Sequence, residues 1–210
     1  MKQVYFLLVL LLVLILPSAL QAQTNVPYDS LRLELEGMYE RDQGIRAKVS
    51  TTQPEEMNAL FAEIHDIDSV NQIQVSAILS KYGWLPQSKV GEKATDALFY
   101  VVQHARSAMM AEYLPALKKS AQEGEAKKHF PAMMEDRLLM FQGKKQLYGT
   151  QATSMLREDG SMVIWPVKGS KKVNKRRKEA GFTTTVEENA ARLQADYNPK
   201  EALPKNSHKF

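Results

Sequence analysis

Apolar residues recur every three or four positions through most of the chain, which is the spacing of one face of an α-helix. This repeat predicts helices over residues 28–41, 54–82, 90–105, 109–122, 131–142, 173–180 and 186–197. Glycines follow several of these segments, and glycine suits the end of a helix because it adopts positive φ without strain. The pattern therefore predicts a mainly α-helical protein.

One segment has a different pattern. Residues 146–167 are rich in Thr, Tyr, Val, Ile and Trp, which favour strands, and Asp159-Gly160 lies near the middle as a turn. We predict one antiparallel β-hairpin over about residues 147–167. Because no repeat or long linker divides the chain, we expect residues 23–197 to form a single-domain helical bundle carrying this hairpin. Residues 198–210 contain two prolines and scattered lysines, and are expected to be a loose tail.

The N-terminus has the pattern of a targeting segment. An apolar run over residues 4–16 follows Lys2, Pro17 ends it, and Ala22 offers a small residue for cleavage. The run is shorter than the roughly 20 residues that a membrane-spanning helix needs. We expect residues 1–22 to be a secretory signal peptide, with an uncleaved anchor as the alternative. The mature protein is then exported, periplasmic or secreted, and does not span the membrane.

Composition and charge exclude several kinds of site and partner. The chain has no cysteine, which excludes disulfides, thiolate metal sites and a cysteine nucleophile. Seven basic and no acidic residues lie between Lys168 and Lys178. Such a run can bind nucleic acid, but no aromatic residue interrupts it to stack on bases. We therefore predict a solvated helix face there and no nucleic-acid partner.

Sequence strings of common enzymes and cofactor sites are absent. The chain has no metalloprotease, nucleophile-elbow, phosphate-loop or dinucleotide-binding motif. The methionine pairs at 109–110 and 133–134 offer thioether ligands for copper, but methionine more often fills gaps in a core. We predict no cofactor and no metal site.

Two polar residues interrupt the apolar face of the segment 54–82. Asp68 and Asn71 fall in the middle of that face, where an unpaired carboxylate would be costly. Either the helix breaks near Ile67 and Asp68 caps the next helix, or both side chains point inward at a polar site. The sequence leaves these alternatives open.

The segment 131–142 has a similar interruption. Arg137 lies within its apolar face and Asp136 lies beside it, although an arginine there can also extend its charged end to water. Because mutual pairing is the cheapest remedy for two buried charges, we predict a buried or half-buried ion pair between Asp68 and Arg137. Asn71, His104 and residues 148–151 are expected close by. His104 itself lies at the edge of an apolar face, where a core role is the commoner one.

Several short strings occur in a fixed order: Gln103-His104-Ala105, then Asp136-Arg137, then the Gln-Leu-Tyr-Gly-Thr-Gln string of residues 146–151. With these strings the chain resembles a bacterial family of unknown function over about residues 68–182. It departs from that pattern at Arg106, where the family tends to have aspartate, and at Leu85, which intervenes before Pro86. The resemblance implies no activity, but it adds weight to these residues as a site.

Two functions from different classes are open. The first is a binding or interaction module for a small molecule, a peptide or an envelope component. Its candidate binding residues are Asn71, Gln103, Arg137, Gln146, Tyr148, Thr150 and Gln151. The second is a hydrolase in which His104 is the general base and Asp68 or Asp136 is its partner. The enzyme requires His104 near a carboxylate at an open cleft, whereas the module requires only a satisfied polar network.

Overall fold

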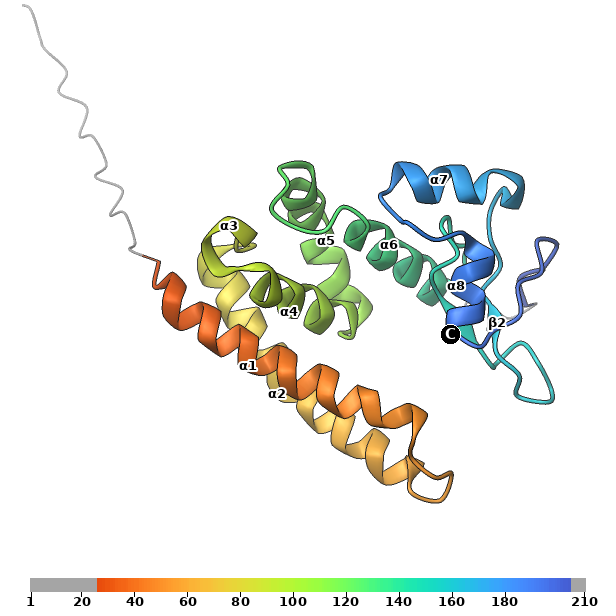
Figure 1. Ribbon diagram of the computed structural model, residues 1–210, viewed down its shortest axis with the longest axis horizontal. Coiled ribbons are helices and arrows are strands. Elements are labelled where there is room, and N and C mark those ends of the chain that lie inside the picture. The colour runs from red at the N-terminus through yellow and green to blue at the C-terminus, as the bar shows by residue number, and fades with distance from the viewer. Residues whose placement is uncertain (1–25, 205–210) are drawn as a thin grey trace, which may run out of the picture.

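The computed structural model describes residues 26–204 and is mainly α-helical, as the hydrophobic pattern predicts (Figure 1). The predicted signal peptide and residues 205–210 lie outside the described residues. The helices are α1 (Tyr28–Ala47), α2 (Met57–Tyr82), α3 (Gln87–Val90), α4 (Glu92–Gln103), α5 (Ser107–Gln122), α6 (Phe130–Phe141), α7 (Val173–Glu179) and α8 (Val186–Arg192), with short 3₁₀ turns at Lys48–Ser50 and Ser170–Lys172.

The two longest helices, α1 and α2, lie side by side, and α4 packs against both (Figure 1). Helix α2 runs without a break from Met57 to Tyr82 and ends at Gly83, whose φ of 72° favours glycine. A helix break near Ile67 is therefore excluded, and Asp68 is not a helix cap. Asn71, on the same face one turn later, is buried.

The main core lies between α1, α2, α4, α5 and α6. Helix α4 is its centre: residues 94–99 and 101–103 are all buried, and its alanines let the neighbouring helices approach closely. Phe99 of α4 stacks on Phe130 at the start of α6, with ring centroids 3.7 Å apart. This contact ties the start of α6 to the centre of the core.

The predicted antiparallel hairpin is confirmed, but it is short. β1 (Ala152–Thr153) pairs with β2 (Val163–Ile164), and Ala152 lies opposite Ile164. A second, smaller core forms where β2 meets α7 and α8, and consists of Ile164, Val167, Val173, Val186 and Ala190. Between α6 and β1, residues 147–150 are irregular, because side chains and not a neighbouring strand bond their backbone groups. Gln146 and Gln151, on either side, still bond the backbone of residues 165–168.

The last described residues pack back on the hairpin and on the 3₁₀ turn that follows it. Glu201 forms an ion pair with Arg157, with 2.6 Å between Oε2 and Nη2, and the Ser170 hydroxyl donates to the Pro199 carbonyl. Within residues 26–204, no helix has both the length and the apolar character needed to cross a bilayer.

Candidate functional site

Four polar side chains meet where α1, α2 and the end of α4 come together. We call Asp42, Arg46, Asp68 and His104 the polar cluster. Arg46 joins its two acids: Nε donates to Asp42 Oδ1 at 2.9 Å and Nη2 donates to Asp68 Oδ1 at 2.5 Å. Asp42 is only 1% exposed, so this ion pair satisfies a carboxylate that would otherwise be costly to bury.

The predicted ion pair between Asp68 and Arg137 is wrong, because Asp68 has a different partner. Asp68 pairs with Arg46, while Arg137 donates from Nε to Gln151 Oε1 at 3.1 Å. Arg46 takes this place because it lies one turn after Asp42 on α1, directly across from Asp68. Burial, together with the charge of Arg46, lowers the pKa of Arg137 to about 10, and the charge of Asp68 acts in the opposite direction. The two residues therefore interact electrostatically without pairing.

His104 forms the third side of the cluster, immediately after the last residue of α4. Its Nδ1 is buried, has no hydrogen-bond partner among residues 26–204 and lies 3.9 Å from Asp42 Oδ1. Burial lowers the pKa of His104 well below its usual 6.5, and the positive charges of Arg46 and Arg137 lower it further. The imidazole is therefore neutral at pH 7.

Asp68 and His104 both face an open cleft of about 1080 Å³. The α2 side chains Ser69, Gln72 and Ser76 line one side, and the connection between α4 and α5 lines the other. Burial is the main cause that raises the pKa of Asp68, and its bond to Arg46 limits the rise. The cleft thus combines hydrogen-bonding groups with two titratable residues whose pKa values are shifted, which is typical of a functional site.

Asn71 and Gln103 are buried beside the cluster and do not line the cleft. The Gln103 amide nitrogen donates to the Met133 carbonyl at 3.4 Å, while its Oε1 and the Asn71 Nδ2 have no partner within the described part of the chain. The structure brings these two predicted binding residues near the site without giving them access to a ligand in the cleft.

Asp136 occupies a different place from the one predicted for a catalytic acid. It is fully buried and accepts hydrogen bonds from the backbone N–H groups of Leu147 (2.7 Å), Tyr148 (3.1 Å) and Thr150 (3.0 Å), and from the Thr150 hydroxyl. Burial raises the pKa of Asp136 to about 6, and these donors limit the rise. A carboxylate with its acceptor sites filled is suited to hold the backbone of residues 147–150 in place and not to move a proton.

The backbone carbonyl groups of residues 147–149 accept hydrogen bonds from two arginines and an asparagine. Arg176 donates to the Leu147 carbonyl at 2.9 Å, Arg177 to the Tyr148 carbonyl at 2.8 Å, and Asn189 to the Gly149 carbonyl at 2.9 Å. Arg177 is only 1% exposed. The prediction of a solvated basic face is therefore wrong for Arg177, because the backbone carbonyls of the loop need donors in a place that water does not reach.

Gln146 closes this loop on itself. Its side-chain Oε1 accepts from the Gln151 backbone N–H at 2.9 Å, and its Nε2 donates to the Gln151 carbonyl at 3.0 Å. We call residues 146–151 the bracketed loop. Gln146, Tyr148 and Thr150 shape it, and Gln151 at its end accepts the bond from Arg137. The loop thus connects to the neighbourhood of the polar cluster through Arg137.

Sequence reasoning missed Asp42 and Arg46, although a signal for Asp42 was present. The apolar stripe of α1 contains Leu31, Leu35, Met38 and Ile45, and Asp42 lies on it at the same helical spacing. The predicted helix ended at Arg41, which left this interruption outside it. The rule that identified Asp68 would have identified Asp42 in a longer helix.

Asp42, Asp68 and His104 also offer one ligand atom each within 4.8 Å of one another, the arrangement of a small metal site. A cation would have to displace Arg46, which already bonds both carboxylates. With Arg137 close by, two positive charges offset the two negative ones, so the cluster has no excess negative charge to attract a divalent ion. The donor set is a poor fit for a metal.

These features define a helical protein with an acid–base cluster at an open cleft and a loop held by buried side chains. A model described as a family of unknown function (DUF6624) matches residues 29–201, and the chain belongs to this family. No curated protein and no solved structure matches the chain.

Proposed function

We propose that the chain is an exported enzyme of the hydrolase type, in which His104 is the general base at the cleft. The observation that carries the proposal is the position of His104, which lines the open cleft and has its buried Nδ1 3.9 Å from Asp42 Oδ1. Export rests on the N-terminal sequence pattern alone. The substrate contains a bond that water can hydrolyse.

In this mechanism Asp42 orients His104. A shift of roughly 1 Å would bring Nδ1 into hydrogen-bond distance of the Asp42 carboxylate, and catalytic hydrogen bonds are often long before substrate binds. Nδ1 would then carry the proton, so that Nε2 could accept one from a water molecule in the cleft. Asp68, at the mouth of the cluster, would contact the substrate.

The test compares His104→Gln with His65→Gln. His65 is exposed (81%) and lines the same cleft, so it controls for the loss of any imidazole there. We expect the native protein to hydrolyse at least one of 4-nitrophenyl acetate, phosphate and glucoside, and His104→Gln to lower kcat/KM by about 100-fold or more. His65→Gln should have little effect. Equal rates for native protein and His104→Gln would contradict the proposal.

The pH profile gives a second measurement on the same protein. A general base acts only when neutral, and the pKa of His104 lies below 6.5 because burial and two arginines disfavour its charged form. We therefore expect kcat/KM to stay constant as pH falls from 8 to 6.5 and to decline only below that. A midpoint at or above 6.5 would show that another group is the base.

The second candidate is a binding protein without catalysis, and one contact favours it. Arg46 already bonds Asp42, so the carboxylate is only in part available to His104. In that case none of the three chromogenic substrates is hydrolysed, and a small polar ligand in the cleft raises the melting temperature of the native protein more than that of Asp68→Asn.

A further inference from the structure

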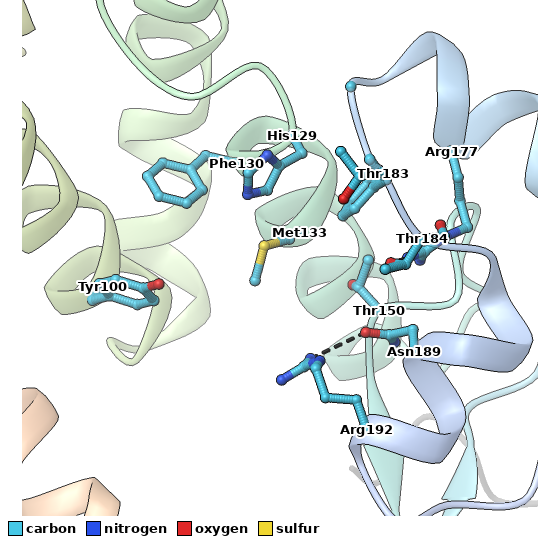
Figure 2. A pocket seen from close by; sticks show the side chains of 12 residues that line it. Tyr100, His129, Phe130, Met133, Thr150, Arg177, Thr183, Thr184, Asn189 and Arg192 are labelled. Carbon is cyan, nitrogen blue, oxygen red and sulfur yellow. Dashed lines mark hydrogen bonds between the residues drawn. The ribbon is translucent and has the colours of Figure 1, made fainter.

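A second pocket lies apart from the cleft, between α4, the start of α6 and residues 181–192 (Figure 2). Its volume is about 290 Å³, and it shares no lining residue with the cleft. This volume is at the small end for ligand sites and suits a molecule of about one ring. We call it the aromatic pocket, because Tyr100, Phe130 and Phe182 contribute to its lining.

The apolar side of the aromatic pocket is held rigidly in place. Phe130 is buried and stacks on Phe99, while Phe182 lies under the Arg177 guanidinium at 4.4 Å from the ring centroid. His129 contacts both rings, with centroid distances of 5.1 Å to Phe130 and 5.3 Å to Phe182. Rings fixed in this way can accept a flat apolar group without the cost of ordering them.

The other side of the aromatic pocket is positively charged. Arg177 and Arg192 line it, and none of its twelve lining residues, all within the described part of the chain, is acidic. Arg192 uses Nη2 to donate to Asn189 Oδ1 at 3.0 Å, and forms no ion pair within residues 26–204. Figure 2 shows its guanidinium extending from α8 toward the side of the pocket where Tyr100 lies.

The charge of Arg192 acts across this space. Burial raises the pKa of Tyr100 and Arg192 opposes the rise, so the two side chains interact although they come from helices far apart in sequence. Arg177 also has its donors engaged, by the Tyr148 carbonyl and by Thr184. Arg192 is therefore the cation that remains able to bind an anion in the pocket.

We infer that the aromatic pocket binds a single-ring aromatic carboxylate, with its ring against the pocket's aromatic side, which includes His129 and Phe182, and its carboxylate on Arg192. A guanidinium matches a carboxylate through two parallel hydrogen bonds, and the rings favour a flat apolar body. A free inorganic anion would leave the apolar side without a partner. This inference is independent of the proposed function, because no residue of the polar cluster takes part.

The experiment measures binding of benzoate by isothermal titration calorimetry, with benzamide as the uncharged probe of the same shape and acetate as the charged probe without a ring. We expect benzoate to bind about tenfold more tightly than benzamide or acetate, since both its charge and its ring make contacts in the pocket. Shifts of backbone amide signals near residues 129–133 and 182–192 on adding benzoate would place the probe in the pocket.

Two variants separate the contributions. Arg192→Gln should weaken benzoate about tenfold and leave benzamide unchanged, whereas Phe182→Leu should weaken both ring-containing probes. Arg41→Gln, which changes an exposed arginine on α1, is the matched control and should bind like the native protein. Melting temperatures are recorded for each variant. Benzoate that fails to bind, that binds no better than benzamide, or that binds Arg192→Gln as it binds the native protein would overturn the inference.

Discussion

Replacing Asp136 with alanine should lower the free energy of unfolding by about 3–5 kcal/mol. The change leaves the N–H groups of Leu147, Tyr148 and Thr150 and one hydroxyl without an acceptor, in a place that water does not reach. Each buried polar group that loses its partner costs about 1–3 kcal/mol, and relaxation of the loop recovers part of the sum. Urea denaturation monitored by circular dichroism measures the loss.

Glu135→Ala is the matched control, because Glu135 precedes Asp136 on α6 and forms only a partly exposed ion pair with Lys118. Its loss should cost less than about 1 kcal/mol. Similar losses for the two variants would show that the bracketed loop contributes little to stability, and that Asp136 is held there for another reason.

Gly149→Ala should lower the free energy of unfolding by nearly as much, about 2–4 kcal/mol. Gly149 has a φ of 69°, and a Cβ atom there would lie 2.4 Å from Val186 Cγ2 at the buried first turn of α8. The substitution therefore adds backbone strain to a steric clash, and α8 must move away from the loop to relieve it. That movement also weakens the bond from Asn189 to the Gly149 carbonyl.

Gly124→Ala separates strain from clash. Gly124 has a φ of 77°, but a Cβ there meets no atom within 4 Å, so only the backbone term of about 1–2 kcal/mol remains. Thermal unfolding of the two variants in parallel measures the difference. If Gly124→Ala loses as much stability as Gly149→Ala, the close approach of α8 to the loop is not the cause.

The helical part of the fold could be predicted because each helix buries a stripe of its own residues, and the stripe is visible in the sequence. The length of the hairpin could not. Residues 146–151 have a composition that favours strands, yet between Gln146 and Gln151 the side chains of Asp136, Arg177 and Asn189 take the hydrogen bonds that a neighbouring strand would have taken. Such partners lie 12 to 40 residues away in sequence, and no local pattern shows them.

The candidate site could be predicted only in part, for the same reason. That Asp68 points inward follows from its position in an apolar stripe, since a buried carboxylate needs a partner. Which cation supplies the partner depends on how α1 and α2 pack. Arg46 and Arg137 both lie near Asp68, and the approach of the helices decides between them. The close approach of His104 to Asp42 likewise follows from packing.

The bracketed loop has one more consequence, for hydrogen exchange. Backbone amides in irregular loops usually exchange with solvent quickly, because no regular structure protects them. In this loop the N–H groups of Leu147, Tyr148 and Thr150 are bonded to a buried carboxylate. We expect them to exchange as slowly as amides in the middle of α4, so that the slowest-exchanging part of the protein includes a segment with no regular secondary structure.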